Sequence, residues 1–175
     1  MNKVKIFTIA IGFMGANVLA DAVCTKKSGE TICQKGVVEK VNTSGILNMQ
    51  STEVEKKLLV KGQASIKQSK IGEMKVYGEI TLTDSTINGS SEIFGMLNTQ
   101  GSIFLKEIYI YANYMSASDS KMMDIIIDSK EKEAEVSLRG KTIVGGNIVF
   151  KGKPGVVSTS SAVKILGKII NGKRV

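Results

Sequence analysis

The sequence predicts an all-β fold, a single-stranded parallel β-helix (β-solenoid) with coils of about 16–17 residues. Three observations lead to this prediction: a sparse motif recurs at nearly constant spacing, apolar residues alternate with polar ones inside each copy, and glycine returns at one phase. Residues 60–72 (VKGQASIKQSKIG) and 76–89 (VYGEITLTDSTING) share the pattern apolar-x-Gly-x-apolar-x-apolar-x-x-Ser-x-apolar. A fixed period of this length is typical of repeat architectures.

The motif extends to four consecutive copies, whose glycines are Gly45, Gly62, Gly78 and Gly95. The alternation predicts strands with one buried face and one solvent-exposed face. Glycine weakens a strand, so its return at one phase indicates a bend or a close approach of two backbones. The Ser or Thr of each copy begins a second, shorter inward-facing segment after a corner. Beyond Leu105 the apolar-x-Gly opening returns in residues 138–144, 150–152 and 165–170.

An antiparallel meander is the alternative architecture for this pattern. It needs hairpin turns at both corners, but the segment TDST at residues 83–86 contains no Asn-Gly or Gly-Gly. Stacking of like residues along a solenoid axis explains why Val60, Val76 and Ile93 recur at one phase. The solenoid is therefore the prediction.

The N-terminal residues 1–22 are expected to be a signal peptide. Lys3 and Lys5 precede the apolar segment 6–19, and the residues ADA at 20–22 fit the small-x-small pattern of a cleavage site. Cys24 raises a lipoprotein alternative, but Val23 stands where a small residue is required. No later segment is long and apolar enough to span a bilayer. We therefore expect an exported protein, periplasmic or secreted.

Cys24 and Cys33 are the only cysteines of the chain. In an exported chain, an isolated pair predicts a disulfide, and closing so short a loop stabilises by roughly 2–3 kcal/mol. A metal site would need further ligands nearby. The expected layout is a disulfide-tied N-terminal segment at residues 23–42 and a β-solenoid domain at residues 43–175.

The composition excludes several classes of chemistry. The chain has no histidine, which removes Ser-His-Asp and Cys-His catalysis and His-ligated zinc. We expect no cofactor and no metal.

Without residues 1–22, the chain carries 22 basic and 15 acidic residues, a net charge of 22 − 15 = +7. Nucleic-acid binding is not expected, because the lysines are spread along the chain and only two arginines exist.

Tyrosines gather in the segment IYIYANYM at residues 108–115. Ile108 and Ile110 are expected to face the core, so that Tyr109, Tyr111 and Tyr114 lie outside. Together they are a candidate surface for stacking a sugar or binding a partner. The alternative is a purely structural aromatic ladder on a strand surface.

Two further residue types suggest chemistry without a regular pattern. Met115, Met122 and Met123 are expected to fill gaps in the core rather than to bind a soft metal. The segment 125–127 predicts a buried strand, and SKEKEAE at residues 129–135 a charged turn or a short helical excursion. The acidic candidates for a catalytic site are Asp84, Asp119, Asp124 and Asp128.

These acids are not tightly grouped along the chain. Asp84 stands at a turn, where aspartate is favoured for backbone reasons, and the repeat places Gln68 and Ser51 at its equivalent positions. The motif therefore does not require a carboxylate there. A polysaccharide-active β-helix enzyme that uses aspartates in a surface cleft is kept as the alternative function.

The repeats at residues 58–72 and 76–89 resemble the short coils of bactofilins, polymer-forming bacterial parallel β-helices. The resemblance covers residues 45–105 well and 138–171 loosely. The export signal, the early cysteine pair and the ending GKIING also resemble small exported proteins of Legionella-type bacteria whose role is undefined. Bactofilins carry no cleaved signal, so the resemblance implies the fold and end-to-end assembly, not a cytoskeletal role.

The sequence thus predicts an exported, non-enzymatic structural or binding protein of the bacterial envelope. It would act by self-association or by binding a glycan or an envelope protein through its surface.

Overall fold

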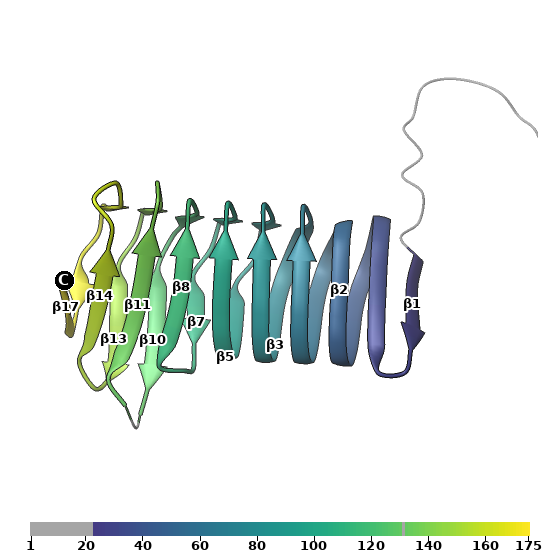
Figure 1. Ribbon diagram of the computed structural model, residues 1–175, viewed down its shortest axis with the longest axis horizontal. Coiled ribbons are helices and arrows are strands. Elements are labelled where there is room, and N and C mark those ends of the chain that lie inside the picture. The colour runs from purple at the N-terminus through teal and green to yellow at the C-terminus, as the bar shows by residue number, and fades with distance from the viewer. Residues whose placement is uncertain (1–22, 131) are drawn as a thin grey trace, which may run out of the picture.

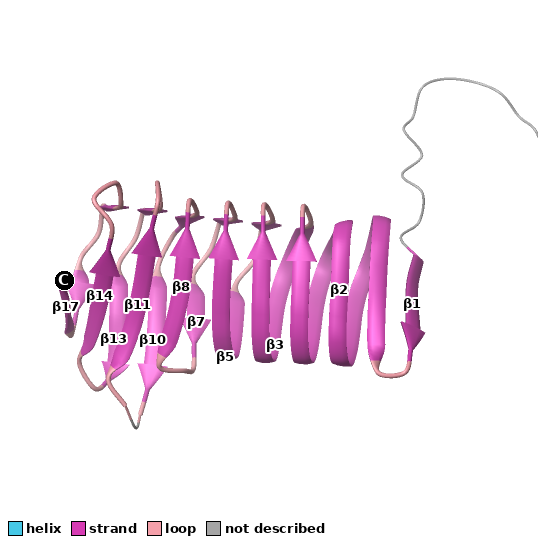
Figure 2. Ribbon diagram, viewed as in Figure 1, coloured by secondary structure: helices cyan, strands magenta, loops and turns pink. Residues whose placement is uncertain are grey.

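The computed structural model describes residues 23–130 and 132–175. Strands wind about seven times around one axis into an elongated parallel β-solenoid, as Figure 1 shows from the purple first coil to the yellow last one. The described part contains strands and loops but no helix (Figure 2), and hence no helix that could cross a membrane. This confirms the predicted fold class. The expected signal peptide, residues 1–22, lies outside the described residues.

In the part of the chain that the structure describes, seventeen strands form one continuous hydrogen-bonded sheet that follows the coils. They are β1 (Val23–Lys27), β2 (Glu30–Lys67), β3 (Lys70–Thr83), β4 (Thr86–Ile87), β5 (Ser91–Gln100), β6 (Ile103–Phe104), β7 (Ile108–Ile110), β8 (Tyr114–Ser118), β9 (Lys121–Met122), β10 (Ile125–Ser129), β11 (Ala134–Arg139), β12 (Ile143–Val144), β13 (Ile148–Gly152), β14 (Gly155–Thr159), β15 (Lys164–Ile165), β16 (Ile169–Ile170) and β17 (Gly172–Arg174).

The pairing of successive coils follows the register of the sequence motif. Val60 of β2 pairs with Val76 of β3, which pairs with Ile93 of β5, and both ladders are parallel. These three side chains are fully buried. The parallel direction excludes the meander, and the stacking of like on like places one continuous apolar core along the axis.

The motif glycines occupy a corner where two backbones come too close for a side chain. Gly62, Gly78 and Gly95 have φ angles of 138°, 135° and 145°, a region that L residues with side chains rarely adopt. A Cβ atom on Gly78 would also overlap the carbonyl oxygen of Gly62 one coil earlier. Gly29 and Gly45 begin the same column of glycines.

A second corner is held by a ladder of buried hydroxyl groups. The backbone N–H of Ser69 donates to Oγ of Ser85 at 3.2 Å, and the Ser85 hydroxyl donates to the carbonyl of Thr83 at 2.9 Å. This arrangement satisfies backbone groups that the turn leaves without strand partners. The buried hydroxyl residues of this column are Thr52, Ser69, Ser85, Ser102, Ser120 and Thr142.

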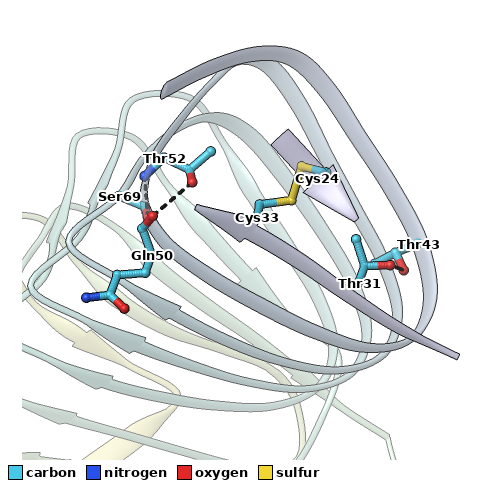
Figure 3. The surroundings of a disulfide bond; sticks show 7 residues. All are labelled: Cys24, Thr31, Cys33, Thr43, Gln50, Thr52 and Ser69. Carbon is cyan, nitrogen blue, oxygen red and sulfur yellow. Dashed lines mark hydrogen bonds between the residues drawn. A yellow bond between two sulfur atoms is a disulfide. The ribbon is translucent and has the colours of Figure 1, made fainter. Parts of the chain in front are cut away.

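The described N-terminal end of the rod carries a disulfide-bonded hairpin (Figure 3). Strand β1 pairs antiparallel with the start of β2, with Cys24 directly opposite Cys33, and the two form a disulfide. The Cys33 side chain is fully buried, and the Thr31 and Thr43 hydroxyls share a 2.7 Å hydrogen bond beside it. Strand β2 runs without a break across the expected boundary at residue 43.

In the later coils, two of the three loose sequence matches have the wrong phase. Leu138 pairs with Ala117, so Gly140 stacks on Asp119 at the second corner rather than in the column of Gly95. Gly167 likewise stacks on Gly146 at another corner. The segment at 150–152 has the expected phase, since Phe150 pairs with Ile127 in the buried column. Glycine is used at several corners, so apolar-x-Gly alone does not define the phase.

The segments with irregular spacing also differ in part from expectation. Met115 and Met122 are buried, but the prediction was wrong for Met123, which is 46% exposed because β9 ends one residue earlier and the chain turns. Ile125 and Ile127 are buried in β10 as expected. In the charged segment that follows, Ser129 ends β10 and Ala134 begins β11. The described residues between them, Lys130, Lys132 and Glu133, form no helix, and the connection between β10 and β11 projects from the rod in Figure 1.

Candidate binding site

The tyrosine segment forms the outer surface of one coil. Ile108 and Ile110 of β7 are fully buried, while Tyr109 is half-buried and Tyr111 is 41% exposed. Tyr114 begins the next strand, β8, where it pairs with Glu135 and is half-buried. A corner therefore separates Tyr114 from the other two tyrosines.

Tyr111 is the last ring of a stack that runs along the rod. The ring centroids of Tyr77 and Phe94 are 4.7 Å apart with planes 14° from parallel, and those of Phe94 and Tyr111 are 4.4 Å apart with planes 6° from parallel. Each ring belongs to a successive coil. Phe94 is therefore covered on both faces, whereas no further ring among the described residues stacks on the face of Tyr111 that points toward the next coil.

The ladder ends because the next coil supplies an aspartate. Ile127 pairs with Ile110, so Asp128 occupies the position that follows the ladder of Tyr111. A short carboxylate in place of a ring leaves an open cleft of about 470 Å³ beside Tyr111. Its lining residues, among those that the structure describes, are Tyr111, Ala112, Asn113, Asp128, Ser129, Lys130 and Lys132.

The cleft combines an aromatic wall with groups of both charges. Asp128 supplies a carboxylate and Asn113 an amide, and Lys130 and Lys132 are exposed on the loop that borders the cleft. The Ser129 hydroxyl donates to the carbonyl of Lys132 at 2.6 Å, which holds this side of the loop against β10. Such a lining can stack a flat or ring-shaped ligand and bind its polar substituents.

The other rings on this surface carry cations of the protein itself. Lys75 Nζ lies 5.1 Å from the ring centroid of Phe94 and 5.6 Å from that of Tyr77, and it pairs with Glu92 at 2.7 Å. The hydrogen bond to Glu92 raises the pKa of Lys75, so its charge is constant at neutral pH. Lys151 Nζ lies 5.7 Å from the ring of Tyr109.

The structure separates Asp128 from the other acidic candidates. The backbone N–H of Lys141 donates to Asp119 at 2.9 Å and that of Asn147 to Asp124 at 2.6 Å, so both carboxylates hold corners. Asp84 sits at the second corner with a φ angle of 49°. In the described ranges, no cluster of three potential metal ligands occurs. Only Asp128 among these four lines the cleft.

Sequence reasoning missed most of this site. Tyr77 and Phe94 lie outside the predicted tyrosine cluster, yet the three rings of the ladder are spaced by 94 − 77 = 17 and 111 − 94 = 17 residues. That spacing equals the repeat length, and it is the signal in the sequence that indicates the ladder. The contributions of Asn113, Lys130 and Lys132 depend on the loop geometry, which the repeat does not determine.

Comparison of the chain with protein-family models, curated proteins and solved structures found no match.

Proposed function

We propose that this chain is an exported, non-enzymatic binding protein of the bacterial envelope, and that the cleft beside Tyr111 binds an acidic saccharide. The observation that carries the proposal is the position of Tyr111. Its ring stacks on Phe94, and Tyr111 also lines a cleft of about 470 Å³ with charged lining residues.

The lining suits a sugar that carries an anionic group. The C–H face of a pyranose packs on an aromatic ring, and Tyr111 provides such a ring. Asp128 accepts hydrogen bonds from sugar hydroxyls, and Asn113 both donates and accepts them. Lys130 and Lys132 balance a carboxylate, sulfate or phosphate substituent of the ligand.

Binding has more support than catalysis. Most enzymes that hydrolyse glycosidic bonds use a pair of carboxylates on either side of the bond. The described lining of this cleft contains one carboxylate, that of Asp128. Cleavage of the saccharide remains the alternative, and analysis of the bound saccharide for shortened products tests it.

The proposal includes the export of the protein and its relationship to bactofilins. The apolar N-terminal segment and the disulfide fit export, and the repeat form is similar to that of bactofilins. End-to-end assembly, the other mode that the sequence predicts, stays a prediction. Light scattering across a concentration series tests it, and a strict monomer would count against it.

Tyrosine fluorescence gives a direct test of the cleft, because the chain has four tyrosines and no tryptophan. We expect trigalacturonate to change the tyrosine emission of the protein in a saturable way. The neutral galactose trisaccharide should bind about tenfold more weakly, since it lacks the carboxylates that pair with Lys130 and Lys132. Absence of binding by both sugars, or equal binding of both, would contradict an acidic-saccharide site.

A further inference from the structure

The net positive charge of the described chain is concentrated at one end of the rod. Residues 23–138 contain 14 basic and 15 acidic residues, a net charge of 14 − 15 = −1. Residues 139–175 contain eight basic residues and neither Asp nor Glu, a net charge of +8. The basic residues of this end are Arg139, Lys141, Lys151, Lys153, Lys164, Lys168, Lys173 and Arg174.

The same end exposes large apolar side chains. Leu166 is 70% exposed, the highest value among the exposed large hydrophobic residues of the described chain, and Ile170 is 45% exposed. Both belong to the last coil. Lys164 and Lys168 lie beside them in sequence and are also exposed, so apolar and cationic groups alternate around the rim of this coil.

No further coil covers the core at this end within the described residues. Strands β15, β16 and β17 pair with β12, β13 and β14 on one side only. Ile165 and Ile169 are therefore only partly buried, although Val144 and Ile148, their partners one coil earlier, are fully buried. Among residues 23–130 and 132–175, the core column thus ends on a surface that is accessible from the axis direction.

Arg174 covers part of this surface. It pairs with Val157 in the column that is otherwise apolar, and its Nε donates to the Thr159 hydroxyl at 2.9 Å. A guanidinium in a core column indicates that this end meets water or anionic groups rather than another apolar coil.

We propose that the last coil docks onto the surface of an anionic lipid bilayer, with Leu166 and Ile170 inserted among the headgroups and the surrounding cations against lipid phosphates. Anionic lipid matches both features of the end, because its interface accepts apolar side chains and attracts Lys and Arg. A second copy joined through the same end would bring two charges of +8 together. A hydrophilic polyanion matches the charge but gives no role to Leu166.

The physics of the interface limits the depth of insertion. The last coil has strand edges without strand partners, and unpaired backbone groups are too costly in hydrocarbon. They remain hydrated at the level of the headgroups. Lys164 and Lys168 can extend their ammonium groups to the phosphates while Leu166 lies deeper. The axis of the rod then extends away from the membrane surface, so that Tyr111 remains accessible.

Vesicle co-sedimentation tests this proposal with the chain from Val23 onward, which holds every described strand. Phosphatidylcholine vesicles that contain about one third phosphatidylglycerol should sediment the protein, and pure phosphatidylcholine vesicles should not. Raising the salt concentration should weaken the binding, because the ionic attraction is screened.

Matched substitutions separate the last coil from the rest of the rod. Leu166→Gln should weaken vesicle binding about fivefold, whereas Leu105→Gln should leave it unchanged. Leu105 is 52% exposed and follows Phe104 as Leu166 follows Ile165, at the corresponding corner of an earlier coil.

The charge contribution has an equally close control. Lys164→Gln should weaken binding about fivefold, whereas Lys121→Gln should have little effect. Lys121 and Lys164 flank Ile143 in the same ladder.

Three results would overturn the proposal. They are no sedimentation with anionic vesicles at low salt, equal effects of the Leu166 and Leu105 substitutions, and dextran sulfate binding as tight as vesicle binding with the same response to Leu166→Gln. Concentration-dependent dimerisation that Leu166→Gln abolishes, without vesicle binding, would assign the surface to a second copy instead.

Discussion

The ring of Tyr111 lies nearly parallel to that of Phe94, with centroids 4.4 Å apart, and Phe94 also stacks on Tyr77, with centroids 4.7 Å apart and planes 14° from parallel. The two ends of this stack therefore carry the same residue type in different surroundings. Tyr77 is 40% exposed beside Lys75, and Tyr111 is 41% exposed beside the cleft. This near-symmetry provides an internal control for the role of the cleft.

Gly78→Ala is expected to destabilise the solenoid by about 3 kcal/mol or more. The substitution meets two obstacles, a φ angle of 135° and the carbonyl oxygen of Gly62. Gly29→Ala is the matched control, because Gly29 has a φ angle of 81° but open space around its Cβ position. It should cost only about 1–2 kcal/mol for the backbone conformation. Denaturant unfolding measures both, and equal losses would show that the close approach has no weight.

Ser85→Ala is expected to lower the free energy of unfolding by about 1–3 kcal/mol. The substitution removes the acceptor of the buried Ser69 N–H and the donor to the Thr83 carbonyl. Ser85→Thr keeps the hydroxyl, and threonine already occupies this column at Thr52. Thermal unfolding of both variants should show a clearly smaller loss for threonine. A harmless alanine would remove the hydroxyl ladder from the account of stability.

Asp119 is expected to make stability depend on pH in the acid range. The backbone N–H of Lys141, followed by the hydroxyl of Ser118, holds the pKa of Asp119 below its ordinary value of 3.8. A lowered folded-state pKa gives stability that is present above the unfolded-state pKa and is lost as pH falls through the folded-state value. The difference in stability between the wild type and Asp119→Asn should therefore change only below about pH 4. A difference that varies near neutral pH would contradict this assignment.

The regular coils could be predicted from the sequence because their spacing is nearly constant. Gly62 and Gly78, and Ser69 and Ser85, lie 16 residues apart, and the parallel ladder brings each pair together. Glycine is required where two backbones come too close for a side chain, and serine is required where its hydroxyl bonds to the backbone. Both requirements leave a visible pattern in the sequence.

The later coils and the cleft were less predictable because loops change the spacing. Ile125 pairs with Ile148, 148 − 125 = 23 residues later, and a fixed period loses phase at such a step. Gly140 fits the apolar-x-Gly pattern but serves another corner. Phe94 stands at an outward position, where the repeat sets no requirement, so only a comparison of exposed positions between coils finds the ladder.

The most direct test of the account is the affinity for trigalacturonate of Tyr111→Ala set beside that of Tyr77→Ala, measured by calorimetry. Each variant removes one terminal ring of the same stack. If the cleft binds the sugar, Tyr111→Ala should weaken binding about tenfold or more, because an aromatic packing face is lost, while Tyr77→Ala should bind as the wild type does. Equal loss in both variants, or unchanged affinity in Tyr111→Ala, would contradict a binding site at the end of the ladder.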